Sequence, residues 1–382
     1  MSEFEAEAPR VHRGLKDVYF DRSGVSSIDG RAGELRYRGY SIHDLAENAT
    51  FEEVCALLLY GELPTRSQLS EIDSELKASR AIPAEIHALI ASLKHAHPME
   101  VLRTAVSALG ALCPEPSDTS TSTLLRQGLR LTAQVPTIIT SHYRLRQGLN
   151  PVEPSRELAH GANFLYMLHG IQPTADAARI MDVDLVLHAE HGSNASSFAA
   201  RVVAGTGANL YAALTAAIGA LSGPAHGGAA EDVIRMVREI GEPANAAAWV
   251  KEKRAQREPI MGFGHRVYRA KDPRARHLSD RAERLSHEFG QPQWYAVLQA
   301  VVEAMQPYSR LGVNVNVDFY AGVIYHLLGI PQDFFVPIFA MGRVPGWVIQ
   351  VREQVENNIL IRPLTVYDGP PSRGWVPIDA RG

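Results

Sequence analysis

Apolar residues recur at helical spacing along most of the chain, and glycine or proline separates one such segment from the next. The first clear example begins at Thr50, which forms a Thr-x-x-Glu capping box with Glu53. Gly61 follows the last apolar position, and Pro64 prevents the helix from continuing. This pattern predicts a helix between Thr50 and Gly61.

A second segment runs from Ser155, the expected N-cap, to Gly170, the expected C-cap. Similar spacing covers residues 83–96, 174–188, 194–204, 209–221, 230–240, 292–305 and 319–328. The only alternating run after the first forty residues spans Val313 to Val317, and it is too short to found a sheet. The sequence therefore predicts an all-α fold.

The chain has 382 residues, which is enough for two or three domains or for one large core with a smaller appendage. At 46% hydrophobic and 21% charged residues, it has the composition of a folded globular protein rather than a disordered one. Neither a repeat nor a low-complexity linker divides it. A second domain is therefore expected as an insertion within one helical core.

The net charge of −4 argues against a protein that coats nucleic acid or an anionic membrane with its whole surface. The charge is uneven, however. The segment from Lys251 to Arg284 contains eleven Lys or Arg and five acidic residues, which gives a local charge of +6 and leaves −10 for the rest of the chain. This segment indicates an anionic partner of small size, because the signatures of nucleic-acid binding are missing.

Two cysteines, Cys55 and Cys113, cannot form a disulfide framework or a thiol pair close in sequence, so we expect a reducing compartment. The run from Leu210 to Leu221 is far shorter than the roughly 20 residues that span a bilayer, and no membrane span is expected. The acidic N-terminus resembles neither a secretory signal nor a transit peptide. Together these features predict a cytoplasmic protein of bacterial or archaeal type.

Two common types of site are disfavoured. The chain has no GxxxxGK[ST] loop, and the Gly-x-Gly pairs at residues 205–207 and 262–264 lack the third glycine of a dinucleotide fingerprint. His188 and His191 lie three residues apart, but without the HExxH order or an evident third ligand. An anion-binding or structural pair is favoured over a zinc site.

Three further positions could carry chemistry. His226 lies in a Gly-rich stretch before a predicted helix, where the helix dipole favours a neutral imidazole, although it could equally decorate a turn. His265 lies among glycines and the cations Arg269, Lys271 and Arg274, a set that suits phosphate or carboxylate groups but also a solvated basic face. Asp318 is either the N-cap of the next helix or, in its apolar surroundings, a general base.

In this order, the motifs of the chain resemble those of the citrate synthase family. The resemblance rests on Gly14-Leu15, Ser27 to Gly30, Leu35 to Tyr40, Leu58 to Pro64, His188 to Ser197, Gly223 to Glu231, Gly262 to Ala275, Asn316 to Asp318, and Gly342-Arg343 through Arg362-Pro363. It implies an almost all-helical homodimer. It also implies a large domain, residues 1–226 and 317–382, with a smaller inserted domain, residues 227–316, that closes over the substrates.

The resemblance further implies the condensation of acetyl-CoA with oxaloacetate to citrate and free CoA. The family's catalytic residues match His226, His265 and Asp318. In these roles Asp318 removes a methyl proton, neutral His226 donates a hydrogen bond to the thioester oxygen, and His265 polarises and protonates the ketone of oxaloacetate. Water then hydrolyses the citryl thioester.

The family's remaining functional residues are also matched. Those expected to bind oxaloacetate are His191, Arg274, Arg343 and, from the other subunit, Arg362, with His188 and Asn194 beside or supporting them. Arg269 and Lys271 match residues that bind the phosphates of CoA. Acetyl-CoA is a co-substrate, and neither a tightly bound cofactor nor a metal is expected.

Three details qualify the match. The first substrate motif, His191 to Asn194, has the spacing of shorter prokaryotic members rather than that of longer eukaryotic ones. Pro345 follows the substrate arginine, where a proline inside a helix normally disturbs it unless it lies in the first turn. Only thirteen residues precede Gly14, so the long extension of hexameric members is not expected, and a plain dimer is favoured.

Three alternatives remain open. A 2-methylcitrate synthase uses propionyl-CoA with the same catalytic residues, and one methylene in an apolar pocket discriminates by only about 1–3 kcal/mol. A catalytically silent CoA-binding paralogue is disfavoured because all three catalytic positions are filled. A nicotinamide-dependent dehydrogenase is the most distant alternative.

Overall fold

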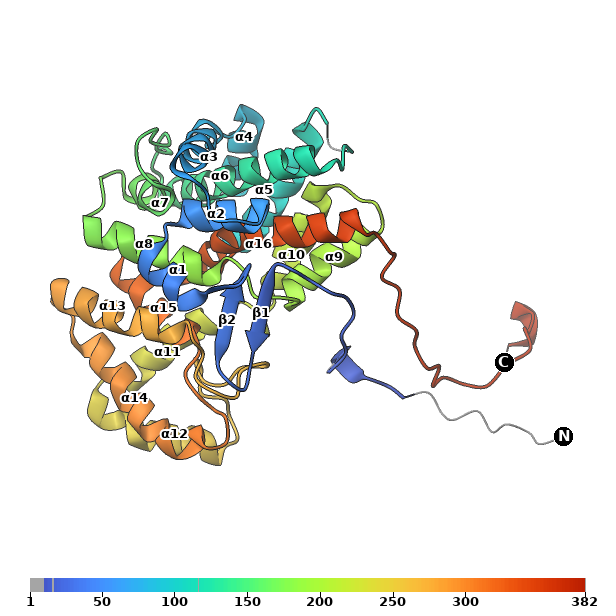
Figure 1. Ribbon diagram of the computed structural model, residues 1–382. Coiled ribbons are helices and arrows are strands. Elements are labelled where there is room, and N and C mark those ends of the chain that lie inside the picture. The colour runs from blue at the N-terminus through green and yellow to red at the C-terminus, as the bar shows by residue number, and fades with distance from the viewer. Residues whose placement is uncertain (1–9, 16, 116, 382) are drawn as a thin grey trace.

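The computed structural model describes residues 10–15, 17–115 and 117–381, within which the chain forms sixteen α-helices and one three-stranded sheet (Figure 1). Residues 1–9, on which the expectation of no targeting signal rests, lie outside the described residues. The prediction of an all-α fold is confirmed, since the sheet consists of three short strands near the N-terminus.

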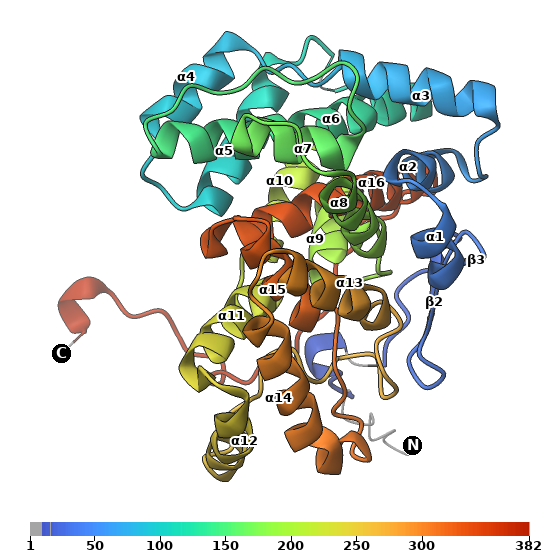
Figure 2. The ribbon, with the colours of Figure 1, turned by 90° about the vertical axis from the view of Figure 1, so that its left-hand side faces the viewer.

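The helices follow one another as α1 (Ile42–Asn48), α2 (Phe51–Tyr60), α3 (Arg66–Ala78), α4 (Ala84–Ser92), α5 (Pro98–Leu112), α6 (Thr121–Arg146), α7 (His160–His169), α8 (Ala175–His188), α9 (Ala195–Gly205), α10 (Leu210–Leu221), α11 (Ala229–Ile240), α12 (Ala246–Ala255), α13 (Ala275–Glu288), α14 (Gln293–Ser309), α15 (Asp318–Leu327) and α16 (Phe335–Glu356). Figure 2 shows α3 to α7 at one end of the molecule and α11, α12 and α14 at the other, with α8, α9, α10 and α16 between them.

Local sequence explains several helix ends. The capping box of Thr50 and Glu53 is present at the start of α2, and Gly61 ends this helix in the left-handed conformation with φ 99°. Gly170 ends α7 in the same way. The predicted cap at Ser155 is wrong, because α7 begins only at His160. The Ser155 hydroxyl instead accepts hydrogen bonds from two backbone N–H groups of the turn that precedes the helix.

The sheet holds one loop of the molecule in place. Strands β1 (Ser26–Asp29), β2 (Glu34–Tyr37) and β3 (Tyr40–Ser41) pair in antiparallel order. At the turn between β1 and β2, the Gly30 carbonyl accepts a hydrogen bond of 2.7 Å from the Arg269 N–H. A Cβ atom at Gly30 would lie 2.3 Å from the Val267 carbonyl oxygen, so glycine is required for this close approach. The hairpin therefore positions the loop that carries His265 and Arg274.

Helix α16 forms the centre of the molecule and packs against α6, α8, α9 and α10. By length and composition, residues Gln332–Glu356 could cross a membrane, but 94% of their most apolar window is buried inside the protein. This segment is therefore buried in the core, and it is longer than the run from Leu210 to Leu221. Pro345 lies in the interior of α16 rather than in its first turn.

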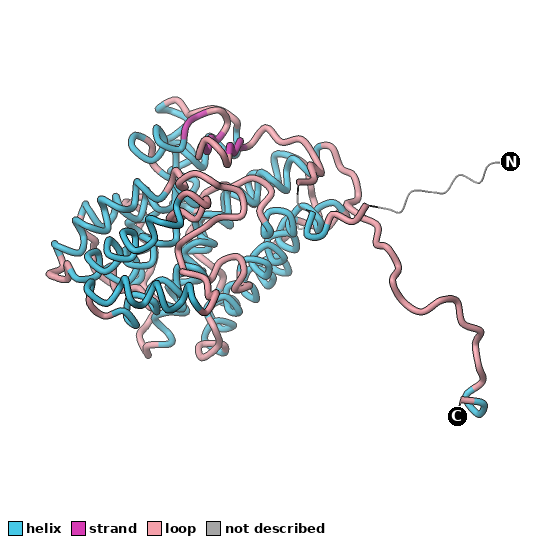
Figure 3. The backbone as a smooth tube through the Cα atoms, turned by 90° about the horizontal axis from the view of Figure 1, so that it is seen from below, coloured by secondary structure: helices cyan, strands magenta, loops and turns pink. Residues whose placement is uncertain are grey.

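The last described segment, residues 357–381, leaves the body of the molecule after α16 (Figures 1 and 3). Its large apolar side chains are exposed, and they include Ile359, Leu360, Leu364, Tyr367, Trp375 and Ile378. An apolar set of this size normally meets a partner surface.

Candidate active site

The site lies where four segments meet: the C-terminal end of α8 with the turn to α9, the turn before α11, the loop before α13 and the start of α15. The His191 Nε2 atom lies 3.1 Å from the Tyr268 hydroxyl, and the rings of His191 and His265 are 5.2 Å apart. From α16, Arg343 Nε donates a hydrogen bond of 2.5 Å to the His188 carbonyl. The structure thus brings together residues from widely separated parts of the chain.

His226 lies in the turn before α11, and its Nε2 atom faces Ser196 at the start of α9. The Ser196 backbone N–H donates to Nε2 at 3.3 Å. The Ser196 hydroxyl lies 2.9 Å from the same nitrogen. Because the backbone amide can only donate and the hydroxyl can also donate, we assign the proton of the neutral ring to Nδ1. Burial, followed by the charge of Arg343, lowers the pKa of His226 to about 4. At neutral pH the residue is therefore an uncharged hydrogen-bond donor through Nδ1.

His265 has the opposite tautomer. Its Nδ1 atom accepts hydrogen bonds from the backbone N–H groups of Val267 at 3.0 Å and Tyr268 at 3.2 Å, which leaves the proton on Nε2. Burial and then the charge of Arg274 lower the pKa of His265 to about 4. Like His226, it is a neutral donor whose orientation is set by backbone groups.

Asp318 is the first residue of α15, and Val317 takes the N-cap position, so the alternative of Asp318 as an N-cap is wrong. The Asp318 N–H donates to the Asn316 side chain at 3.1 Å, and the Asn316 amide donates to the Gly264 carbonyl at 3.0 Å. This bridge ties the start of α15 to the loop of His265. Burial raises the pKa of Asp318, while His188 and Arg274 oppose the shift.

Arg274 is buried beside a carboxylate that the sequence analysis did not select. Its Nε and Nη2 atoms donate to the two oxygens of Asp272 at 3.0 and 2.7 Å. Although burial opposes it, the charge of Arg274 and its hydrogen bonds hold the pKa of Asp272 below its ordinary value. Asp272 could have been found from sequence, because it lies two residues before Arg274, within reach of a fork-shaped guanidinium.

Arg343 is buried to 1% exposure within α16. Its Nη1 atom is among the buried polar atoms without a hydrogen-bond partner in the part of the chain that the structure describes. Burial lowers the pKa of Arg343 to about 10, so the side chain still carries its charge at neutral pH. A buried cation with an unpartnered nitrogen favours the binding of an anion.

His188 and Asn194 support these groups. The His188 Nδ1 atom lies 2.8 Å from the Asp184 carbonyl one turn earlier in α8. Asn194 is the N-cap of α9, and its Oδ1 atom accepts hydrogen bonds from the N–H groups of Ser196 and Ser197. It therefore fixes the residue whose N–H orients His226.

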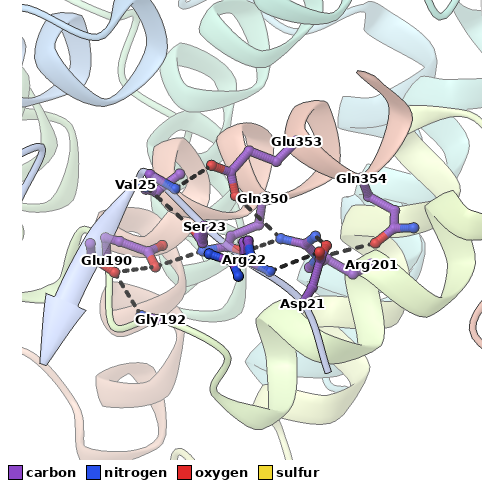
Figure 4. A network of polar contacts seen from close by, with 12 residues as sticks. Asp21, Arg22, Ser23, Val25, Glu190, Gly192, Arg201, Gln350, Glu353 and Gln354 are labelled. Atoms are coloured by element: carbon purple, nitrogen blue, oxygen red, sulfur yellow. Dashed lines mark hydrogen bonds and ion pairs between the residues drawn. The ribbon is translucent and has the colours of Figure 1, made fainter. Parts of the chain in front are cut away.

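A network of polar contacts, not predicted from sequence, includes Glu190, the residue before His191 (Figure 4). Glu190 is completely buried, and its Oε1 atom accepts hydrogen bonds from Gln350 at 2.9 Å and Ser26 at 3.2 Å. Gln350 in turn accepts from Arg201 at 3.0 Å. Burial raises the pKa of Glu190 to about 7. The network connects β1, α9 and α16 to the turn that carries His191.

Three of the predicted residues lie away from this centre. Arg269 and Lys271 are exposed, and Lys271 lines a cleft of about 980 Å³ together with Arg276, Arg281 and Arg310. Arg362 is exposed on the segment that leaves the body after α16. Over residues 10–15, 17–115 and 117–381, no group of three or more His, Cys, Asp or Glu could hold a metal ion.

Comparison with known proteins gives consistent matches. The family model described as "Citrate synthase, C-terminal domain" matches residues 14–364. A Bacillus subtilis protein named citrate synthase 2 is 44% identical, covering 97% of this chain and 99% of the relative. A Corynebacterium glutamicum protein named 2-methylcitrate synthase 2 is 41% identical, covering 97% and 98%.

Solved structures agree with the sequence matches. The crystal structure of citrate synthase from Pyrobaculum aerophilum has a TM-score of 0.90 at 40% identity and covers 97% of this chain and 95% of that one. The ternary complex of carboxymethyl coenzyme A and oxaloacetate with citrate synthase from Thermoplasma acidophilum has a TM-score of 0.93 at 31% identity. That match covers 98% of this chain and 100% of the other.

The buried pair of Asp272 and Arg274 gives a testable prediction. Asp272→Asn keeps the size of the side chain but leaves the Arg274 charge unpaired, so we expect the free energy of unfolding to fall by about 3–5 kcal/mol. Asp232→Asn breaks the more exposed pair with Arg235 on α11 and should cost no more than about 1 kcal/mol. Denaturant unfolding measures both. Equal losses in the two variants would contradict a buried, charge-dependent pair.

Proposed function

The chain belongs to the citrate synthase family, and from that premise we propose that it condenses acetyl-CoA with oxaloacetate and hydrolyses citryl-CoA to citrate and free CoA. His226, His265 and Asp318 are the proposed catalytic residues. His188, His191, Asn194, Arg274, Arg343 and Arg362 are proposed to bind oxaloacetate or to support that binding.

The observation that carries the proposal is the pair of buried guanidinium groups, Arg274 and Arg343, beside two neutral histidines that donate hydrogen bonds. Oxaloacetate has two carboxylates and a ketone. The carboxylates match the two cations, and the unpartnered Nη1 atom of Arg343 gains an acceptor when one of them binds. The ketone oxygen matches a neutral donor.

On the acetyl side, Asp318 removes a proton from the methyl group and becomes a neutral acid. The electron pair of the broken C–H bond moves into the enolate, whose oxygen accepts a hydrogen bond from Nδ1 of His226. Because His226 is uncharged and its ring is fixed by Ser196, it stabilises this oxygen without reorganisation. Burial raises the pKa of Asp318 and so strengthens it as a base.

On the oxaloacetate side, Nε2 of His265 donates to the ketone oxygen. The enolate carbon attacks the ketone carbon, and the proton on Nε2 passes to the new alkoxide to give the hydroxyl of citryl-CoA. The proton that Asp318 took from the methyl group then returns through water to the His265 imidazolate, which restores both groups. Water then cleaves the thioester and releases CoA. A second backbone-fixed donor in a buried site lowers the barrier at this oxygen by several kcal/mol, on the order of 3.

We further propose a homodimer in which Arg362 completes the site of the partner subunit. The segment beyond α16 leaves its own body and exposes Leu364 to 84% and Trp375 to 78%, which is unfavourable in water. A second copy of the chain would cover these side chains and receive the Arg362 charge near its own Arg343.

Residues 227–316 are proposed to form the smaller domain, with residues 1–226 and 317–382 as the large one, closing over the substrates. The two parts meet beside the cleft that Lys271 lines, where His43 on α1 and His277 on α13 lie 2.8 Å apart. Arg269 and Lys271 are proposed to bind the phosphates of CoA. The proposed location is the cytoplasm.

A second candidate substrate is propionyl-CoA, which would make the protein a 2-methylcitrate synthase. Two relatives from Corynebacterium glutamicum carry that name at 40–41% identity, close to the values for relatives named citrate synthase. The proposed catalytic residues serve both substrates equally well.

The proposed reaction can be tested directly. Purified protein should release thiol only when oxaloacetate and acetyl-CoA are both present, with a higher kcat/KM for acetyl-CoA than for propionyl-CoA. Asp318→Asn should lower kcat at least about 100-fold, because the base is lost. Asp73→Asn, which breaks a pair with Lys77 on α3, is the matched control and should keep wild-type activity.

Other outcomes separate the alternatives. A higher kcat/KM for propionyl-CoA would identify the second candidate. Binding of CoA without thiol release would indicate a silent paralogue, and a change in absorbance at 340 nm with a nicotinamide cofactor would indicate a dehydrogenase. Full activity of Asp318→Asn would refute the proposed base.

The site shared between the two subunits can be tested with a heterodimer. When Arg362→Ala and Asp318→Asn subunits are co-expressed with different tags, the purified heterodimer contains one site with both Arg362 and Asp318 intact. It should have about half of the wild-type activity, whereas each homodimer should be nearly inactive. A heterodimer no more active than its parents would contradict the proposal.

A further inference from the structure

The proposed mechanism gives no role to Asp184, a carboxylate buried near the site. Asp184 on α8 is 0% exposed, and Tyr325 on α15 is 1% exposed. The Tyr325 hydroxyl donates a hydrogen bond of 2.6 Å to Asp184 Oδ2. Burying a carboxylate is costly unless it is satisfied, so a pair at this depth needs a reason.

The other side of Asp184 faces His188, one turn later on the same helix. The His188 Nδ1 atom lies 2.8 Å from the Asp184 backbone carbonyl and 3.4 Å from Oδ1 of its side chain. A carbonyl oxygen only accepts hydrogen bonds, so Nδ1 carries the proton. The Asp184 backbone carbonyl therefore sets the rotation of the imidazole, and among the described residues no hydrogen bond reaches Oδ1 of the Asp184 side chain.

The proposed base, Asp318, lies on α15, the helix that also carries Tyr325. Asp318 and Tyr325 are seven residues apart on α15, and Asp184 and His188 are four apart on α8, so each pair shares a helix face. Among the charged neighbours of Asp318, His188 has the largest effect on its pKa, and Asp184 is a further contributor. Asp184 and His188 therefore act on Asp318, the group that removes the methyl proton.

We propose that Asp184 and Tyr325 are a positioning pair. Tyr325 holds the Asp184 carboxylate 3.4 Å from Nδ1 of His188, and the charge of this carboxylate acts on the imidazole and on Asp318. The proposal rests on the proposed function, because it takes Asp318 as the base. Neither residue touches substrate; both act through His188 and through the charge of Asp184.

The negative charge of Asp184 raises the pKa of Asp318. Besides burial, the groups that act on Asp318 are His188 and Arg274, which lower its pKa, and Asp272 and Asp184, which raise it. Arg343 also interacts with the Asp318 carboxylate. Removing the negative charge of Asp184 lowers the pKa of Asp318 and makes it a weaker base, so the acid limb of activity moves to lower pH.

The test uses two variants of the full-length enzyme. Asp184→Asn keeps the size and an acceptor oxygen for Tyr325 but removes the charge. We expect its kcat to fall about tenfold or more, with the acid limb of the kcat–pH profile at lower pH than in the wild type. The KM for oxaloacetate should change less than about threefold. Tyr325→Phe removes one hydroxyl and should lower kcat by a smaller factor.

Asp182→Asn is the matched control. Asp182 lies two residues earlier on α8, is also buried, and accepts hydrogen bonds from the Phe51 N–H and from Arg179, away from His188. This variant should lose thermal stability but keep the wild-type pH profile.

The proposal is overturned if Asp184→Asn keeps wild-type kcat and pH profile while its melting temperature falls as in Asp182→Asn. If Asp184→Asn does not fold, Tyr325→Phe decides, and an unchanged kcat in that variant overturns the proposal. Absence of thiol release by the wild type would instead refute the proposed function.

Discussion

The site depends on one electrostatic constraint: two guanidinium groups, Arg274 and Arg343, are buried in the same region of the protein. Asp272 satisfies the first with two hydrogen bonds, whereas the second keeps an unpartnered Nη1 atom among the described residues. Their charges also help to keep the nearby histidines neutral. After burial, the charge of Arg343 is the next largest cause of the low pKa of His226, and the charge of Arg274 is the next largest cause of the low pKa of His265. A dicarboxylate substrate supplies the negative charge that this arrangement lacks.

The fold meets this constraint with rigid, close-packed supports. The Gly30 turn approaches the loop of His265, and Gly346 on α16 approaches the turn after α8, where a Cβ atom would lie 2.1 Å from the Ala189 carbonyl oxygen. The polar network from Glu190 through Gln350 to Arg201 joins the same elements from behind. Because the Ser196 N–H and hydroxyl hold Nε2 of His226, and backbone N–H groups hold Nδ1 of His265, the donors are oriented before substrate binds.

Sequence predicted what depends on local chemistry and on the motif order. Thr50, Glu53 and Gly61 delimit α2 as expected. Of the eleven predicted site residues, eight come together at the site, all but Arg269, Lys271 and Arg362. It failed where tertiary contacts decide. Ser155 caps a turn because the Asn163 side chain accepts a hydrogen bond from its N–H. Val317 precedes α15 because Asn316 connects the start of this helix to the loop of His265. Pro345 is tolerated inside the buried helix α16. Glu190 and Asp184 were missed because only packing shows what a buried carboxylate faces, whereas the spacing of Asp272 and Arg274 could have shown their pairing.

The central claim, that the site holds two neutral histidines with opposite tautomers, is tested most directly by nitrogen NMR of ¹⁵N-histidine-labelled protein. The account predicts neutral rings at pH 7, with the proton on Nδ1 of His226 and on Nε2 of His265, and titration near pH 4. Because these folded pKa values lie below the usual 6.5, the contribution of the two neutral histidines to folding stability should be fully present above about pH 6.5. It should be lost as the pH falls toward 4. An imidazolium signal from either residue at pH 7, or the reverse tautomers, would contradict the account.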